Sequence, residues 1–129
     1  MKQKEYSGAI NIYLKILKIK PNYSEIYYDI GIAYSKTHDS MKAIESYTRG
    51  LEISTGDLKF NIIRELANAF FLSKEYEAAI EYLLMGKTEF KNDEEKKIEI
   101  SYLLAIAYYY TNKKDESLKL FRDIYKKNP

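Results

Sequence analysis

One stretch of sequence decides the fold of this chain: YYDIGIAYSKTHDSMKAIESY, residues 27–47. Apolar residues recur in it at helical spacing, first as Ile30 and Tyr34 and then as Ile44 and Tyr47. Spacings of three and four residues place such side chains on one face of a helix, and the polar run between the two sets interrupts the pattern. Nowhere does the sequence alternate apolar and polar residues long enough for a strand. The stretch therefore predicts two helices joined by a short turn, and the fold class is all-α.

The pattern returns along the chain, which indicates internal repeats. Small residues occupy two columns of the repeat, one at Ala9, Ala43, Ala79 and Ser117 and the other at Gly31, Ala67 and Ala105. The steps in the first column are 34, 36 and 38 residues. Large residues form two further columns, Tyr34, Phe70 and Tyr108, and Tyr13, Tyr47, Leu83 and Phe121. Small residues are needed where two helices cross closely, so the columns predict a series of helical hairpins.

The spacing Tyr27-x-x-Ile30-Gly31-x-x-Tyr34, followed by Ala43-x-x-x-Tyr47, resembles the tetratricopeptide repeat (TPR) signature W-x2-L-G-x2-Y followed by A-x3-F, with tyrosine replacing tryptophan. Related segments occur around Ala67 and Ala105, so the resemblance covers essentially the whole chain. It implies a right-handed α-solenoid of antiparallel helical hairpins with a concave inner face. It also implies a scaffold for protein–protein interaction and no enzyme activity.

Caps and helix-breaking residues predict where the helices lie. We expect seven helices, at about 6–19, 23–36, 40–53, 58–72, 75–88, 93–111 and 115–127. They would form a single repeat domain, 1–129, made of a half repeat at 1–22 and repeats at about 23–56, 57–91 and 92–129. Asn22 with Glu25 predicts a cap at the second helix, and Gly56 predicts a C-cap for the third. Extra residues around 54–59 and 92–97 are expected to lengthen the helices that follow them.

Composition excludes several classes of function. Lys and Arg number 21 against 19 Asp and Glu, and the resulting charge of +2 exerts no long-range attraction on nucleic acid or membranes. The chain has no cysteine, which excludes disulfides, thiolate zinc sites and a cysteine nucleophile. The longest apolar run, 102–110, is about half of what a membrane-spanning helix needs, and the N-terminus lacks the apolar core of a signal peptide. We expect a soluble cytoplasmic chain without membrane contact.

Residues that could carry chemistry are few. The single histidine, His38, lies beside Asp39, and we interpret it as a solvated turn residue and not as a catalytic base. The acidic clusters at 93–95 and 115–116 fall near predicted helix starts, where carboxylates stabilise the helix dipole, and this explanation outweighs a metal site. No glycine-rich phosphate loop, H-E-x-x-H or G-x-S-x-G motif occurs. We therefore predict no catalytic residues, no metal and no cofactor.

The resemblance implies that the first helix of each hairpin lines a concave groove. The candidate partner-binding residues there are Glu25, Tyr28, Asp29, Asn61, Arg64, Glu65, Asn68, Glu99, Tyr102 and Tyr109. Neighbouring Ile32, Phe71, Leu103 and Ile106 could line the groove or pack between helices. Tyrosines supply a large contact area at a low entropy cost, and the carboxylates favour cations. The predicted partner is a protein or peptide segment that is apolar or basic.

One well-known TPR type, the carboxylate clamp, captures acidic C-terminal tails of chaperones with Lys, Asn and Arg side chains. At the corresponding positions this sequence has Tyr28, Ile32 and Glu65. Asp29 and Glu65 would repel a terminal carboxylate. We therefore predict that the chain is not of the carboxylate-clamp type.

Two alternatives to a peptide-binding scaffold stay open. The first predicted helix has a wider apolar surface than one neighbour covers, and the sequence stops where a further helix would begin. We expect a fragment of a longer array, or else a structural spacer or self-association module whose ends contact other copies. RNA binding is the lesser alternative, through the basic residues Lys113, Lys114, Lys119, Arg122, Lys126 and Lys127. The near-neutral charge of the chain does not favour RNA binding.

Overall fold

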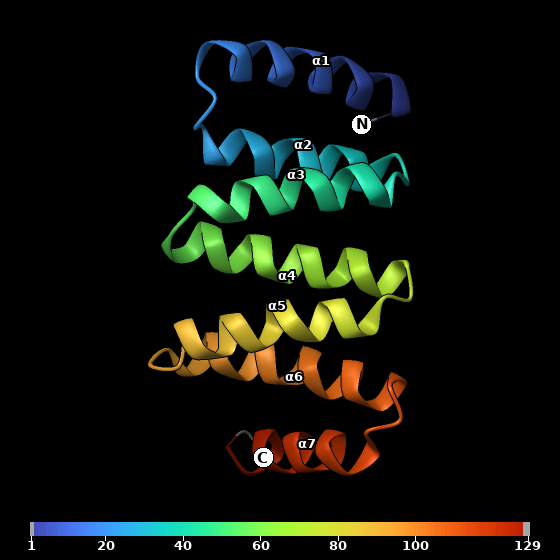
Figure 1. Cartoon of the computed structure of the whole chain (residues 1–129), viewed down its shortest axis with the longest axis vertical. Coiled ribbons are helices and arrows are strands. Elements are labelled where there is room, and N and C mark those ends of the chain that lie inside the picture. Colours follow the sequence, from blue (N-terminus) through green and yellow to red (C-terminus); the bar gives the residue numbers. More distant parts are fainter. Residues whose placement is uncertain (1, 128–129) are drawn as a thin grey trace. The chain divides into compact units, whose positions relative to one another are not determined.

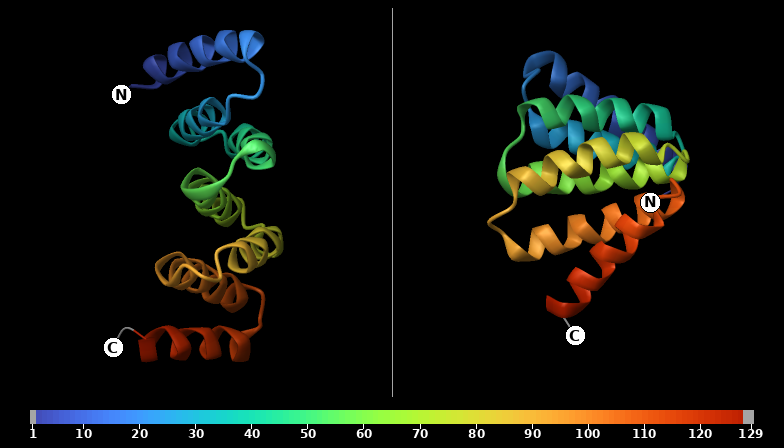
Figure 2. Two further views of the ribbon diagram at one scale, coloured as in Figure 1. Left: turned by 90° about the vertical axis from the view of Figure 1, so that its left-hand side faces the viewer. Right: turned by 60° about the horizontal axis from the view of Figure 1, so that its bottom comes forward.

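A computed structural model describes residues 2–127, and within them the chain forms seven α-helices (Figure 1). The helices are α1 (Gln3–Ile19), α2 (Ser24–Lys36), α3 (Ser40–Ile53), α4 (Gly56–Leu72), α5 (Tyr76–Glu89), α6 (Glu94–Tyr110) and α7 (Lys114–Lys127). The chain divides into two compact units, Met1–Ala69 (unit 1) and Phe70–Pro129 (unit 2), and the division falls inside α4. Within each unit consecutive helices pack as antiparallel pairs, α1 on α2 and α2 on α3 in the first and α5 on α6 and α6 on α7 in the second, which confirms the all-α class and the helical hairpins. Figure 2 shows two of these hairpins, α2 with α3 and α6 with α7, from other directions.

The predicted helix boundaries agree with the structure to within three residues. The largest difference is at α1, which begins at Gln3 because the backbone N–H of Lys2 donates a hydrogen bond to the Glu5 carboxylate (2.8 Å). This bond satisfies a donor that would otherwise be unpaired at the helix start. The predicted lengthening is also confirmed, since α4 and α6 have 17 residues each and α2 has 13.

Two predicted caps were wrong. Asn22 does not cap α2, because the N-cap residue is Tyr23 and no side chain accepts a hydrogen bond there. Gly56 does not end α3, which stops at Ile53 and is followed by an extended Ser54. Gly56 instead begins α4 with a φ of 62°, a backbone conformation that glycine adopts without steric cost. A cap depends on the direction of the chain as it enters the next helix, and the packing of the helices determines that direction.

The three turns within hairpins share one geometry. His38, Lys74 and Asn112 occupy the same column and have φ values of 62°, 59° and 63°. In the first turn the N–H of Asp39 donates to the carbonyl of Tyr34 (2.9 Å), and equivalent bonds close the other two turns at 2.8 and 2.9 Å. These are Schellman motifs with a residue other than glycine in the left-handed position. His38 is exposed in its turn, which agrees with its interpretation as a solvated turn residue.

The core of unit 1 places a glycine of α2 against a tyrosine of α3. Tyr47 is fully buried, and a Cβ atom built on Gly31 would lie 2.3 Å from its Cε1. Ile62, Ile63 and Leu66 of α4 complete this core, each with no exposed surface. The small residue therefore lets the two helices of the hairpin approach around an aromatic ring, as the column at Gly31 predicted.

The core of unit 2 contains one polar crossing. Ser117 of α7 occupies the column that holds alanine at 43 and 79, and its hydroxyl donates to the carbonyl of Ala105 in α6 (2.7 Å). Both residues are buried, as are Leu83, Ile100 and Leu104 in the core of this unit, with at most 1% of their surface exposed. A hydroxyl fits here because it is small and finds an acceptor across the hairpin.

Candidate partner-binding face

In unit 1 the candidate residues form two helical stripes. Glu25, Tyr28 and Asp29 lie three and four residues apart on α2, so they share one face of that helix. The α4 residues Asn61, Arg64, Glu65 and Asn68 have the same spacing. We call these seven residues the α2–α4 face. Tyr28 is half-buried, and Glu25, Asp29 and Asn68 are exposed.

Tyr47 of α3 lies close to residues of both stripes. Its ring centroid lies 6.3 Å from that of Tyr28, and its hydroxyl lies 3.3 Å from the Ser35 hydroxyl. The pKa of Tyr47 is raised above its ordinary value, first by burial and then by the Glu65 carboxylate and Tyr28, against a lowering by the bond to Ser35. Tyr28 and Glu65 are therefore both close enough to influence one phenol, which places the two stripes around Tyr47.

Sequence reasoning assigned Tyr47 to packing alone. The same column holds Tyr13 and the hydrocarbon side chains of Leu83 and Phe121, and the hydroxyl at position 47 was the available sign that the ring could reach a polar partner. In the structure that partner is Ser35, near the C-terminal end of α2. The hydroxyl thus brings a polar group to the base of the face.

Negative charge is concentrated on the α2 side of this face. The pKa of Asp29 is raised, first by partial burial of its carboxyl group, although the residue as a whole is exposed, and then by repulsion from the Glu25 carboxylate. On α4, Glu65 has a cationic neighbour, because its carboxylate lies 3.7 Å from the Arg64 guanidinium. Arg64 also lies over the Phe60 ring at 5.8 Å. The face therefore combines an aromatic side chain with carboxylates. The carboxylate on α4 has a neighbouring cation in Arg64, whereas the two on α2 lie beside each other.

In unit 2 the candidate residues Glu99, Tyr102 and Tyr109 lie on α6. Tyr102 packs edge-on against Phe121 of α7, with ring centroids 6.0 Å apart, and this pair occupies the same columns as Tyr28 and Tyr47. Tyr109 packs edge-on against Tyr110 at 5.4 Å. Tyr102 and Tyr109 still expose 51% and 53% of their surfaces. These tyrosines thus support the hairpin and also present aromatic surface to solvent.

An aromatic stack that sequence reasoning missed lies at the turn end of unit 2. The ring of Tyr76 in α5 stacks on Tyr110 of α6 with centroids 4.8 Å apart, and the ring centroid of Phe71 lies 5.8 Å from that of Tyr76. Periodicity alone could not have found this stack, because Tyr76 and Tyr110 begin and end different helices. The stack fixes the ring of Tyr110 at the end of α6, and Tyr109 packs edge-on against that ring.

The basic residues considered for RNA binding are partly engaged within unit 2. Lys127 pairs with Glu94 at 3.2 Å, and Lys113 and Lys114 lie 5.8 Å from the ring centroids of Tyr108 and Tyr109. Three of the six cations therefore have intramolecular partners, and they do not form an uncommitted basic stripe.

Acidic residues at the helix starts have a structural explanation. Asp93 is the N-cap of α6, where its carboxylate accepts hydrogen bonds from the backbone N–H (3.2 Å) and the side-chain ammonium (3.0 Å) of Lys96. These bonds lower the pKa of Asp93. Among residues 2–127 no three His, Cys, Asp or Glu side chains are grouped so as to hold a metal ion. In the same range no helix has the length and apolar character to cross a membrane.

Family models of the tetratricopeptide repeat match the sequence at residues 12–45 and 99–129, which together make up about half of the chain. No curated protein matches the sequence.

Several solved structures have the same fold. A MamA double mutant from RS-1 is 18% identical with a TM-score of 0.79 over 96% of this chain and 66% of its own. A putative kinesin light chain of Podosopora anserina with TPR-like repeats is 16% identical, with a TM-score of 0.77 over 94% of this chain and 66% of its own. YrrB, described as a TPR protein with an unusual peptide-binding site, is 15% identical, with a TM-score of 0.59 over 98% of this chain and 79% of its own. This chain thus spans just under two thirds of the first two structures, and the likeness concerns the fold.

Proposed function

Because this chain belongs to the tetratricopeptide repeat family, whose members generally mediate protein–protein interactions, we propose that it holds a segment of a partner protein on its α2–α4 face. The observation that carries the proposal is the half-buried Tyr28 beside Glu25 and Asp29. Such an aromatic side chain contributes contact area at a low entropy cost, and the carboxylates select the charge of the partner. In unit 2 the exposed rings of Tyr102 and Tyr109 offer contacts of the same kind.

The partner that fits this face is apolar with basic side chains. The pKa of Asp29 is raised by burial and by Glu25, so its ionised form is destabilised in the free protein. A lysine or arginine of the partner would stabilise that form and lower the pKa of Asp29 on binding. An acidic tail would face Glu25, Asp29 and Glu65 and be repelled, which supports a partner other than that of the carboxylate clamp.

A titration with two synthetic helical peptides tests the proposal. The Lys/Leu peptide carries leucines at helical spacing among lysines, and the Glu/Leu peptide has glutamate in place of each lysine. Adding the Lys/Leu peptide to the isotope-labelled chain should shift the amide resonances of the α2–α4 face. Tyr28→Ala should weaken binding about tenfold, equivalent to about 1.4 kcal/mol. Tyr28→Phe keeps the ring and should bind nearly as well as the wild type.

Charge is tested by a matched pair of variants. Asp29→Asn should weaken binding of the Lys/Leu peptide, while Glu52→Gln, which removes one charge from an exposed site on α3, should not. Tyr102→Ala probes the surface on α6 in the same assay. Unchanged affinity in both Tyr28→Ala and Tyr102→Ala would remove the proposal.

A scaffold role accords with the fold, which is typically non-catalytic. Self-association is a second candidate function. The observation that favours it is exposed apolar surface on the helices at either end of the described chain. Ile12 and Ile19 of α1 are 60% and 87% exposed, and Leu118 and Tyr125 of α7 are 50% and 73% exposed. Sedimentation equilibrium of the chain decides between the candidates, because a monomer in concentrated solution excludes assembly through these helices.

A further inference from the structure

Unit 1 contains a cleft that the α2–α4 face does not include. It lies between α1 and α3, has a volume of about 780 Å³, and has Tyr27, Ile30 and Tyr34 of α2 as its floor. These residues follow one another at three and four positions, on a different side of α2 from Glu25, Tyr28 and Asp29. The volume falls within the range of about 300–1,000 Å³ that is typical of ligand pockets. We call this recess the α1–α3 cleft.

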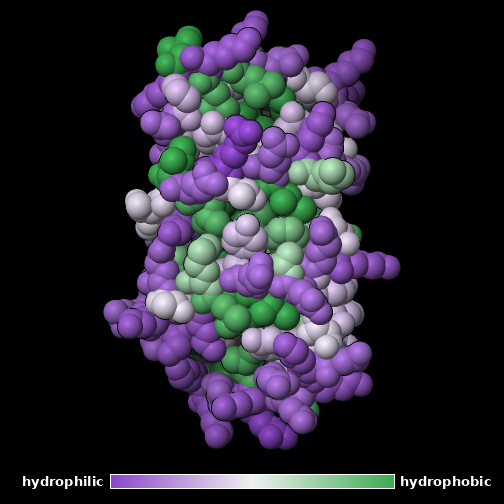
Figure 3. Space-filling model, viewed as in Figure 1, coloured by the Kyte–Doolittle hydropathy of each residue, from purple (hydrophilic) through white to green (hydrophobic). Residues whose placement is uncertain are grey.

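The walls of the cleft carry both apolar and basic side chains. From α1 come Leu14 and Leu17 together with Lys15 and Lys18. Figure 3 shows the molecule in the orientation of Figure 1. Near the top of that view, hydrophobic side chains are gathered with hydrophilic side chains around them. An apolar base of this kind accepts large hydrocarbon side chains, and a charged rim decides which ones enter.

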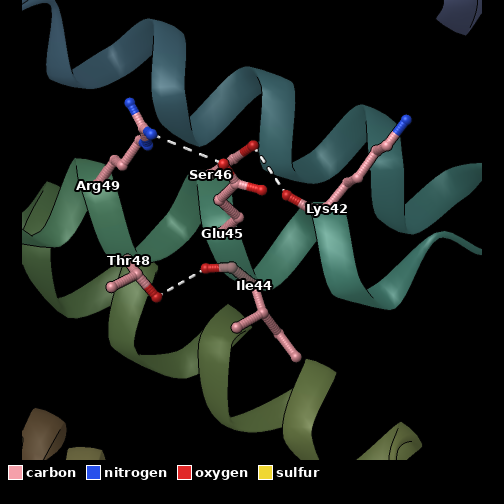
Figure 4. Close-up of polar contacts among 6 residues, drawn as sticks. All are labelled: Lys42, Ile44, Glu45, Ser46, Thr48 and Arg49. Atoms are coloured by element: carbon pink, nitrogen blue, oxygen red, sulfur yellow. Dashed lines mark hydrogen bonds and ion pairs between the residues drawn. The ribbon is translucent and has the colours of Figure 1, made fainter.

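The wall from α3 is formed by one side of that helix. Figure 4 shows Lys42, Glu45, Ser46 and Arg49 projecting from this side, with Ile44 and Thr48 on the opposite side. The Ser46 hydroxyl donates to the backbone carbonyl of Lys42 (2.9 Å) and so is satisfied within its own helix. The charged side chains of α3 therefore dominate this wall.

The rim carries an excess of positive charge. Four cations, Lys15, Lys18, Lys42 and Arg49, surround the cleft, and Glu45 is the one carboxylate among its lining residues. Glu45 lies 3.7 Å from Arg49, but both side chains are about two-thirds exposed, and a pair of this kind contributes little. Lys42 lies over the Tyr34 ring at 5.6 Å. Lys15 and Lys18 are both exposed, so their charges are available to a ligand.

We propose that the α1–α3 cleft binds an acidic amphipathic segment of another protein. Large apolar side chains of that segment would lie on Tyr27 and Tyr34 of the floor and against Leu14 and Leu17. Its Asp and Glu side chains would pair with Lys15 and Lys18 on one wall and with Arg49 on the other. The charge is opposite to that expected for a ligand of the α2–α4 face, so the two surfaces of unit 1 select different partners.

The apolar floor distinguishes this ligand from a small anion or a nucleic acid. A phosphate group would use the cations and leave the apolar surface of Leu14 and Leu17 uncovered. An amphipathic helix presents both features at once, and its apolar stripe can lie in a groove between two helices. The occupant is therefore a peptide that is both acidic and apolar.

The Glu/Leu peptide is the probe. In a titration of the isotope-labelled full chain, amide shifts should change at residues 11–18 and 42–49 and not at the Asn61–Asn68 stripe of α4. Lys15→Glu with Lys18→Glu should weaken binding about tenfold or more at low salt. The matched control is Lys4→Glu with Lys91→Glu, which changes the net charge equally at exposed sites outside the cleft and should bind like the wild type. Lys15→Gln with Lys18→Gln provides a milder pair if the reversed charges disturb folding.

Four outcomes would overturn the proposal. They are the absence of binding by the Glu/Leu peptide, shifts confined to the α2–α4 face, an equal loss of affinity in the control pair, and equally tight binding of the Lys/Leu peptide in the cleft. Dilution of the free chain supplies another test, since concentration-dependent shifts at residues 11–18 and 42–49 would make a second copy the occupant. Tyr28→Ala should leave binding of the Glu/Leu peptide unchanged. The proposal for the α2–α4 face and the proposal for the α1–α3 cleft can therefore fail independently of each other.

Discussion

Replacing Gly31 with alanine tests the helix crossing at the centre of unit 1. The added Cβ would lie 2.3, 2.5 and 2.8 Å from three ring atoms of Tyr47. Carbon atoms in contact normally stay about 3.5–4.0 Å apart, so the ring or the helix must move by about 1 Å. Tyr47 has no exposed surface, and its hydroxyl lies beside Ser35, so the ring has little room to retreat.

The expected loss of stability follows from two opposing effects. Overpacking of a core costs about 1–3 kcal/mol, while replacing a glycine inside a helix by alanine returns about 0.5–1 kcal/mol. We expect Gly31→Ala to lower the free energy of unfolding by about 1–2 kcal/mol. The control is Gly8→Ala in α1, where nothing lies within 4 Å of the new Cβ and only the gain in helix propensity remains. Gly50→Ala should fall between them, since its nearest contacts are 3.1 and 3.2 Å.

Urea unfolding followed by far-ultraviolet circular dichroism measures these differences. A second arm combines Gly31→Ala with Tyr47→Leu, which copies the residues at 67 and 83 of the next repeat. If the clash is the cause, the double variant should be more stable than the sum of the two single changes predicts. The reasoning is refuted if Gly31→Ala is as stable as the wild type, or if the two substitutions are additive.

Three further predictions concern a turn, a buried hydrogen bond and a cap. Lys74→Gly should raise the free energy of unfolding by about 0.5–1 kcal/mol, because the residue has a φ of 59° and glycine adopts it without strain; no rise in thermal midpoint relative to Lys74→Ala would contradict this. Ser117→Ala should lower stability by about 0.5–1.5 kcal/mol through loss of the 2.7 Å bond to Ala105, and urea unfolding with no change would argue against that role. The pKa of Asp93 is held below its ordinary value of 3.8 by its bonds to Lys96, so its ionised form stabilises the fold above that pH. The advantage of the wild type over Asp93→Asn should shrink as pH falls below 3.8 toward the lowered folded-state value, and thermal midpoints across that range that differ by a constant amount would exclude the effect.

Much of the fold could be predicted because the repeat is recorded in local spacing. The columns at Gly31, Ala67 and Ala105 predicted the hairpins, and both boundaries of each of the seven helices agreed to within three residues. The caps at Asn22 and Gly56 were wrong, because a cap depends on the backbone angles of a few loop residues. Packing of the flanking helices selects those angles, and a residue type alone does not.

The candidate site was less accessible to sequence reasoning. The resemblance placed Tyr28 and Tyr102 on the groove-lining faces of their helices, but their contacts with Tyr47 and Phe121 depend on how the hairpins cross. The α1–α3 cleft was not predicted at all. Its cations come from two helices separated by α2, and in the sequence each resembles an ordinary solvated lysine or arginine.

The sequence by itself determined the helical repeat, the small residues at each crossing and the aromatic and charged side chains available for binding. These follow from side chains three and four residues apart, which neighbour one another on any helix. Only the tertiary structure decided which side chains from different helices meet, and so separated the acidic α2–α4 face from the basic α1–α3 cleft. The physical reason is that charge and apolar surface act over a few ångströms of space, and the distance between two helices is not written in the spacing within either one.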